Sequence, residues 1–315
     1  MKISVIKNFI NKYIFSNRKN IDSTASLLLQ DIDFRKVSLE DVPLADIFQN
    51  QNYSQMVSGI KNDLFKREFA LSFLNTNPMN EKTYAKLSLV KLQAIRAQMD
   101  SEFIRDAEVL VSASKILKEV FDMRYGENKY VFVSIGRSLS AAANCLGFLG
   151  VDARQVPLSG CRGSLKDIDK IVNTMLEHVG FKDYKSFLCE TLPKNSNRRY
   201  LFCDFMNSGA TLSVFKTLLN HPKVHLGSKR DQYIGINNKY LCNNIDCDSE
   251  EYKSVVMDFY HRLLGQGFDV YADVNYYHYA SLNPPDTGLK PRCPQQNKLM
   301  RFCMLDILNF SKSIE

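Results

Sequence analysis

The fold of this chain is decided by the segment Arg199-Tyr200-Leu201-Phe202-Cys203-Asp204-Phe205-Met206-Asn207-Ser208-Gly209-Ala210-Thr211-Leu212. It predicts a buried strand that ends in one carboxylate, then a short loop of small and polar residues, then an amphipathic helix. Loop amides and a helix N-terminus suit an anionic ligand, because their N–H groups carry partial positive charge. The hydroxyls of Ser208 and Thr211 add donors, and Asp204 is placed to accept hydrogen bonds from ligand hydroxyls.

A second strand–loop–helix unit lies upstream of this segment. Tyr130–Ile135 is an unbroken apolar run of the kind found in buried strands. The loop Gly136-Arg137-Ser138 follows, and Leu139–Leu146 is predicted to be a helix that ends at Gly147 or Gly150. Asp152–Leu158 is the next candidate strand. The two units together favour two neighbouring loops at one end of a sheet.

The rest of the second half alternates between helix-like and strand-like segments. Predicted helices are Leu165–His178, Lys182–Leu192, Thr211–Leu219 and Ser249 or Glu250 to Leu264, and predicted strands are Tyr233–Ile236 and Asp269–Val274. This alternation predicts an α/β fold with a mostly parallel sheet flanked by helices and joined by right-handed crossovers. Ligands of such sheets bind outside the carboxyl ends of the strands, where both loops fall.

The two units resemble those of type I phosphoribosyltransferases over roughly residues 127–240. In that family the first loop holds pyrophosphate, and the second follows a strand that ends in acids. The resemblance implies that Arg137, with Gly136 and Ser138, faces the diphosphate of phosphoribosyl pyrophosphate, that Asp204 orients the ribose, and that Arg162 and Lys166 belong to a mobile basic segment. It also implies a 5′-phosphate site made by the loop residues Asn207, Ser208, Gly209, Ala210 and Thr211.

The resemblance further implies Mg²⁺ as a cofactor that arrives with the diphosphate ligand. No residue is expected to bind the metal directly, and Asp204 would reach it through the ligand. In an active member Asp204 and Arg137 would be the catalytic residues, and the acceptor of the phosphoribosyl group is unknown.

Two positions depart from the family pattern. Cys203 stands where the family has a second acid, and Asn207 stands where purine-specific members carry an aspartate. An amide is no general base near neutral pH. A non-catalytic protein that senses a sugar phosphate or nucleotide is therefore an alternative to a transferase, and whether the protein is an enzyme stays open.

A third interpretation is a phosphosugar isomerase (SIS) domain. Gly136-Arg137-Ser138 resembles the G-[KR]-S loop of that family, and Asn207–Thr211 resembles its S-x-S-G-x-T loop. That family places the two loops closer together and does not require Asp204. All three interpretations use the same residues to hold a phosphorylated sugar.

Composition favours a protein of the cytoplasm. The chain is 45% hydrophobic and 24% charged, with a net charge of +7 that suits anionic partners. Eight cysteines, several in apolar contexts, are typical of reduced thiols. We find no apolar run of transmembrane length, no signal-peptide core in Met1–Phe15, and no nucleic-acid-binding motif. The expected partner is a phosphorylated sugar or nucleotide.

Glycine is rare before Gly126 and frequent after it. This shift predicts a helical N-terminal region over 1–126 and an α/β domain over 127–280. The C-terminal loop and helix over 281–315 is a candidate hood over the site, with a surface connector as the alternative. Asn80 is the predicted N-cap of a long helix that begins near Glu81 and keeps its apolar period as far as Val120. The N-terminal helices are a candidate surface for a homo-oligomer or a protein partner.

Overall fold

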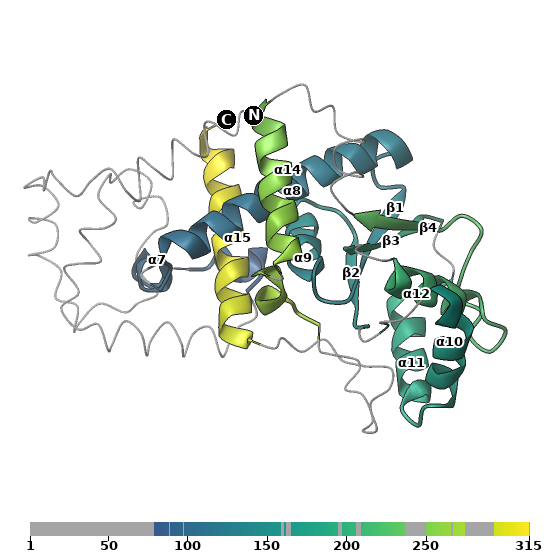
Figure 1. Ribbon diagram of the computed structural model, residues 1–315. Coiled ribbons are helices and arrows are strands. Elements are labelled where there is room, and N and C mark those ends of the chain that lie inside the picture. Colours follow the sequence, from purple (N-terminus) through teal and green to yellow (C-terminus); the bar gives the residue numbers. More distant parts are fainter. Residues whose placement is uncertain are drawn as a thin grey trace, which may run out of the picture. The chain divides into compact units, whose positions relative to one another are not determined.

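The computed structural model describes residues 79–87, 89–96, 98–158, 161, 165–194, 197–205, 209–236, 250–265, 267–274 and 293–314 (Figure 1). They fall into two compact units. One contains the residues up to Glu108 together with those from Lys298 onward, and the other runs from Val109 to Asn297. Most of the N-terminal region predicted to be helical lies outside the described residues. Among the described helices, none has the length and apolar character needed to cross a membrane.

The second unit is built on a sheet of four parallel strands. These are β1 (Tyr130–Ile135), β2 (Ala153–Val156), β3 (Arg199–Phe205) and β4 (Gln232–Ile236), in the spatial order β2-β1-β3-β4. Every residue of β1 is buried, as its continuous apolar sequence predicts for a central strand. The predicted parallel α/β sheet is therefore confirmed, and β1 and β3 are hydrogen-bonded neighbours.

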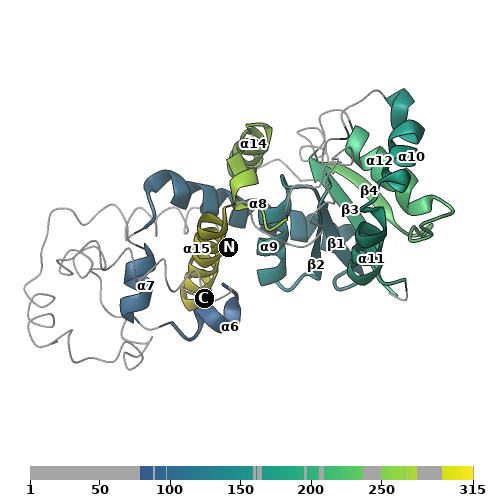
Figure 2. The ribbon, with the colours of Figure 1, turned by 90° about the horizontal axis from the view of Figure 1, so that it is seen from below.

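Helices cover both faces of this sheet (Figure 2). α9 (Ser140–Phe148) links β1 to β2, and α12 (Ala210–Asn220) links β3 to β4. α10 (Ile168–Glu177) and α11 (Phe181–Thr191) link β2 to β3 after a 3-10 turn, η2 (Leu165–Asp167). The sequence predicted each of these helices to within a few residues.

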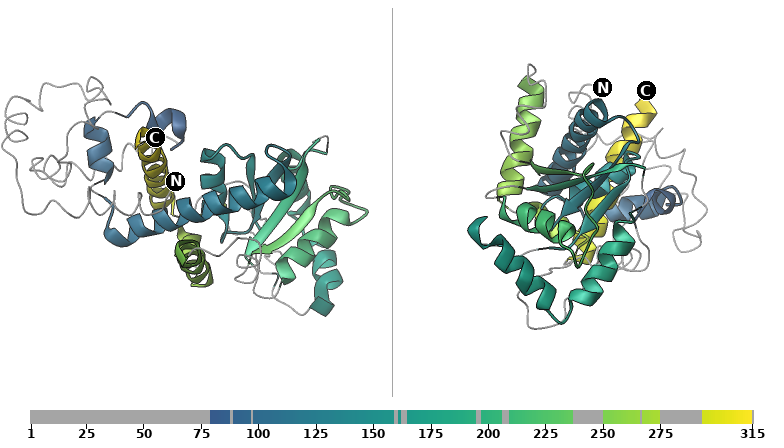
Figure 3. Two further views of the ribbon diagram at one scale, coloured as in Figure 1. Left: turned by 90° about the horizontal axis from the view of Figure 1, so that it is seen from above. Right: turned by 90° about the vertical axis from the view of Figure 1, so that its right-hand side faces the viewer.

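The two faces of β1 pack against different helices because successive side chains of a strand point in opposite directions. Val131, Val133 and Ile135 belong to the hydrophobic core that α10, α11 and α12 complete. Ribbon views from two further sides show helices packed on the sheet (Figure 3). On the opposite face Phe132 lies against Phe121 of α8 (Ser101–Tyr125), with ring centroids 6.0 Å apart. α9 packs against β1 and β2.

The strand order places a topological switch point between β1 and β3. β2 and β3 lie on the two sides of β1 in the sheet. The chain reaches β2 from β1 through α9, and it reaches β3 from β2 through α10 and α11. The loops that follow β1 and β3 therefore leave the carboxyl edge toward opposite faces. Parallel α/β sheets bind ligands at such a switch point.

The segment predicted as the last strand, Asp269–Val274, is not a strand. It begins within a 3-10 turn, η3 (Gly267–Tyr271), which follows α14 (Glu250–Leu264). Tyr271, Ala272 and Val274 of this segment are buried. Just before it, Phe268 meets Phe259 of α14 with ring centroids 5.8 Å apart. Its backbone is fixed by local and side-chain contacts, among them the bond from the Asp273 amide to Ser140 Oγ at 2.9 Å.

The first unit contains α6 (Glu81–Tyr84), α7 (Leu89–Arg96), the first residues of α8, and α15 (Pro294–Ile314) from Lys298 onward. Asn80 caps α6 as predicted, because its Oδ1 accepts the Thr83 amide at 3.0 Å. The single long helix predicted from Glu81 is wrong, since three helices occupy that stretch. Asp100 Oδ1 accepts the Phe103 amide at 2.8 Å, which supplies a fresh start for α8.

One carboxylate joins three helices of the first unit. Asp306 of α15 accepts hydrogen bonds from Tyr84 of α6 at 2.5 Å and from Arg96 Nε of α7 at 2.8 Å. The boundaries between the two compact units fall after Glu108, within α8, and after Asn297, within α15. The domain division at 126/127 and 280/281 remains a prediction.

Candidate functional site

The loop after β1 has a backbone that only glycine suits. Gly136 has φ +72°, and its amide donates to the Val156 carbonyl at 2.8 Å. A Cβ at this position would lie 2.9 Å from the Leu158 carbonyl oxygen, closer than real Cβ atoms come. The loop therefore turns tightly against the end of β2, and this turn places Arg137 and Ser138 at the carboxyl edge of the sheet.

Arg137 and Ser138 both contact Asp269 of η3. The Arg137 guanidinium lies 3.3 Å from Asp269 Oδ2, and Ser138 Oγ donates to Asp269 Oδ1 at 3.3 Å. All three side chains lie near the same edge of the sheet. Sequence reasoning missed Asp269, which it assigned to a strand, although a carboxylate after an apolar helix was a visible signal.

A polar network joins η3 to the start of α9 and to β2. Gln155 Nε2 donates to Asn144 Oδ1 at 2.8 Å and to Asp273 Oδ2 at 3.3 Å, and Ser140 Oγ donates to Gln155 Oε1. Together with the Asp269 contacts, these bonds hold the segment 269–273 against the loop that follows β1. The segment thus forms one wall of the candidate site.

Asp204 lies near the end of β3 and is partly exposed. Its carboxyl group nevertheless sits among protein atoms, and this desolvation raises its pKa from 3.8 to about 7. A hydrogen bond from the Phe205 amide lowers the pKa, and the negative charge of Asp269 raises it. The site therefore brings two carboxylates near each other and supplies one guanidinium, from Arg137, to Asp269.

Two thiols lie close to Asp204. Burial, followed by the charge of Asp204, raises the pKa of Cys161 to about 12 and raises that of Cys203 well above its ordinary value. Both groups thus remain thiols at neutral pH and are poor nucleophiles. Cysteines within the described ranges are free of disulfides, as the composition predicts.

The loop after β3 ends at Gly209, which has φ +74° and is the N-cap residue of α12. Glycine offers no side chain for capping, although the Gly209 carbonyl accepts the Ser213 amide at 3.0 Å. Ala210 is buried and Thr211 is partly exposed in the first turn. The predicted site residues Asn207 and Ser208 lie outside the described residues, as does Arg162.

The arrangement can be stated residue by residue. Arg137, Ser138 and Asp269 meet, Asp204 lies within electrostatic reach of Asp269, and Gly209 follows β3 at the same edge. Lys166, expected in a mobile segment, lies in η2. Within the described ranges no three His, Cys, Asp or Glu side chains group in a way that would hold a metal ion.

A comparison of the chain with protein-family models, with curated proteins and with solved structures finds no match.

Proposed function

We propose that the carboxyl edge of the sheet at β1 and β3 binds a phosphorylated sugar, with phosphoribosyl pyrophosphate as the leading candidate. One observation carries the proposal. Two loops with glycines at positive φ, Gly136 and Gly209, follow neighbouring strands at the point where the crossovers of a parallel sheet diverge. Backbone amides in tight loops and at helix N-termini are the usual partners of phosphate.

Each part of the ligand has a partner of suitable chemistry. The loop 136–138 and the guanidinium of Arg137 would hold the diphosphate, since charge-assisted hydrogen bonds of arginine to phosphate are among the stronger ones. Asp204 would accept hydrogen bonds from the ribose hydroxyls. Gly209, Ala210 and Thr211, with Asn207 and Ser208 before them, would hold the 5′-phosphate at the start of α12.

Mg²⁺ fits this set of donors as a partner that enters with the ligand. Burial is the main cause of the raised pKa of Asp204, and the negative charge of Asp269 adds to it, so a divalent cation would offset the repulsion between these two carboxylates. Mg²⁺ commonly takes few protein ligands and fills its shell with phosphate oxygens and water. When bound, it would neutralise charge on the diphosphate.

Transfer of the phosphoribosyl group is the catalytic form of this proposal. Asp204, with a pKa near 7, is suited to accept a proton at physiological pH, whereas Cys161 and Cys203 are not. A sensor would use the same contacts to bind without turnover. Release of pyrophosphate in the presence of candidate acceptors separates the two forms.

Calorimetric titration with phosphoribosyl pyrophosphate is the direct test. We expect saturable binding, with affinity at least about tenfold higher in Mg²⁺ than in EDTA, because the cation screens the diphosphate against both carboxylates. Ribose 5-phosphate should bind more weakly, since it lacks the group that Arg137 holds. Absence of binding, or affinity that ignores Mg²⁺, contradicts the proposal.

A further inference from the structure

We propose a second ligand site, at the amino ends of the strands, that binds an organic phosphate ester of nucleotide size. A cavity of about 480 Å³ opens there, opposite the edge that carries the phosphorylated-sugar proposal. Its lining includes Lys194, Arg198, Tyr200, Asn220, Arg230 and Asp231. These residues come from the segment that enters β3, from the end of α12, and from the turn before β4. We call this the amino-edge cavity.

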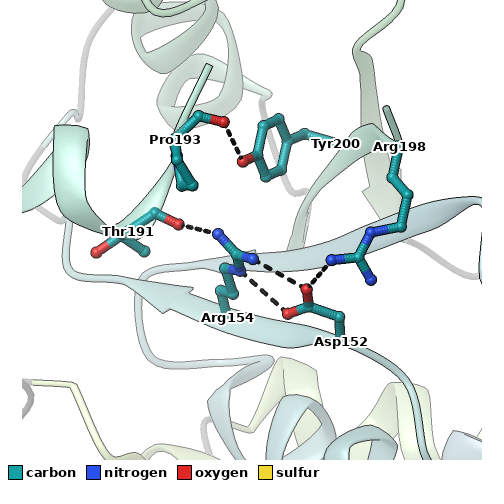
Figure 4. Close-up of polar contacts among 6 residues, drawn as sticks. All are labelled: Asp152, Arg154, Thr191, Pro193, Arg198 and Tyr200. Carbon is teal, nitrogen blue, oxygen red and sulfur yellow. Dashed lines mark hydrogen bonds and ion pairs between the residues drawn. The ribbon is translucent and has the colours of Figure 1, made fainter. Parts of the chain in front are cut away.

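Two residues that line the amino-edge cavity, Tyr200 and Arg198, belong to a cluster of polar contacts that extends outside the lining (Figure 4). The Tyr200 hydroxyl donates to the Pro193 carbonyl at 2.9 Å, and Arg154 donates to the Thr191 carbonyl at 2.6 Å. The Arg154 guanidinium also lies 5.8 Å from the centre of the Tyr200 ring. The Tyr200 side chain is therefore held in place before a ligand arrives, which lowers the conformational entropy lost on binding.

Arg198, which also lines the cavity, is held by a carboxylate that it shares with Arg154. Asp152 accepts hydrogen bonds from Arg154 at 2.9 and 3.0 Å and from Arg198 at 2.5 Å. Burial by itself raises the pKa of Asp152, but the bonds and charges of both arginines outweigh burial and lower it. One carboxylate thus serves two guanidiniums, and the cluster keeps an excess positive charge.

The acid in the cavity lining is already engaged by backbone amides. Asp231 is buried, and its Oδ1 and Oδ2 accept hydrogen bonds from the Tyr200 amide at 3.3 Å and the Ser228 amide at 2.8 Å. Both oxygens are therefore directed at the turn and the strand. Lys194 and Arg230, by contrast, are exposed, and the side chains of both pair with no other residue in the described ranges. They are available to an anion.

The end of α12 works against an anion, because a helix C-terminus carries roughly half a negative charge. Here the last carbonyls are occupied by donors. Leu219 accepts the amides of Leu226 and Gly227 at 3.0 and 2.9 Å, and Lys216 accepts Asn220 Nδ2 at 2.8 Å. Lys194, Arg198 and Arg230 bring three full positive charges, so the cations dominate.

Gly227 lets the turn approach α12 closely. A Cβ on Gly227 would lie 2.4 Å from Asn220 Oδ1, so the amide of Asn220 lies against bare backbone. Asn220 lines the cavity with its Nδ2 bound to the Lys216 carbonyl. A volume of about 480 Å³ falls in the range of small-molecule sites and exceeds the need of a free phosphate ion. The cations of the lining and the size of the cavity together indicate a nucleotide or sugar phosphate.

The test is a titration with ADP in EDTA, with adenosine, ribose 5-phosphate and inorganic phosphate as separate arms. We expect ADP to bind, and the Lys194→Ala/Arg230→Ala double variant to bind it at least about tenfold more weakly, since two charge-assisted contacts are lost. Lys229→Ala is the matched control. It removes one positive charge, where the double variant removes two, from an exposed residue beside Arg230 that does not line the cavity, and it should bind ADP like wild type.

The outcomes separate this site from the one proposed at the carboxyl edge. ADP affinity should survive Gly209→Val, which alters only the carboxyl edge. Ribose 5-phosphate binding that is lost in the double variant would assign the site to sugar phosphates. Equal binding of ADP by the double variant and wild type overturns the proposal. So does binding of adenosine or inorganic phosphate as tight as that of ADP, the latter meaning an adventitious ion only.

Discussion

Asp204→Asn should weaken binding of phosphoribosyl pyrophosphate about 10- to 100-fold and should stabilise the fold above pH 7. The loss of binding follows from exchanging a charged acceptor for a neutral one, because a hydrogen bond to a charged group is worth about 1.5–3 kcal/mol. The gain in stability follows from the pKa of Asp204, which is raised from 3.8 to about 7 by burial. The charged form of Asp204 is therefore less stable in the folded protein than in the unfolded chain.

The sign of the pH effect is fixed by proton linkage. Between about pH 4 and pH 7 the folded state holds a proton on Asp204 that the unfolded state has lost, so wild-type stability falls as the pH rises through this window. Asparagine carries no charge at any pH, and the variant should lack this decline. Urea unfolding at pH 5 and pH 8 measures the difference, which should be larger at pH 8.

Asp169→Asn is the matched control for this experiment. Asp169 is exposed in the first turn of α10, outside β3. Asp169→Asn therefore removes one carboxylate, as Asp204→Asn does, from a surface position. It should leave ligand affinity unchanged and alter stability by only a few tenths of a kcal/mol. If Asp204→Asn instead destabilises the protein at pH 8 and binds normally, Asp204 serves the fold and not a ligand.

Gly209→Val should abolish binding of phosphoribosyl pyrophosphate while the protein stays folded. Gly209 has φ +74°, a conformation that valine adopts only with strain, and its backbone begins α12 where we place the 5′-phosphate. The strain costs about 1–3 kcal/mol, less than a typical domain's stability. The branched side chain would also crowd the backbone amides that a phosphate needs to approach.

Gly150→Val separates strain from loss of the site. Gly150 has φ +85°, and a Cβ there would meet no atom within 4 Å. It follows α9 at the opposite edge of the sheet, where it lines a different cavity. Both variants should lose similar stability in thermal unfolding, but only Gly209→Val should lose affinity. Equal affinity in the two variants would exclude a phosphate at the start of α12.

The sheet was predictable because its signals are local. Tyr130–Ile135 and Arg199–Phe205 are apolar runs with polar loops after them, and a buried central strand needs nothing more to be recognised. The Asn80 cap was predictable for the same reason, since its partner Thr83 is three residues away. Apolar periodicity survives a short interruption, however, so the breaks before α7 and α8 were missed.

The chemistry of the site depended on contacts that no local pattern contains. Ser138 and Asp269 lie 131 residues apart in sequence, so their contact exists only in the folded chain. Asp269–Val274 was predicted as a strand because alternating burial looks the same in an irregular segment packed on helices. The amino-edge cavity was missed because Lys194 and Arg230, which are far apart in sequence, line it together only in the folded chain. The shape of the turn beside them depends on Gly227 and Asn220.

The strand order also bears on how the chain emerges during synthesis. β1, α9 and β2 form a short local unit, whereas β3 pairs with β1 only after α10 and α11 have been made. Until then β1, a strand whose residues are all buried in the fold, has one edge of unpaired amides and carbonyls. Such an edge is open to pairing with other chains. We expect a ribosome-bound fragment that ends before Arg199 to aggregate or bind chaperones, and one that extends past Phe205 to be protected.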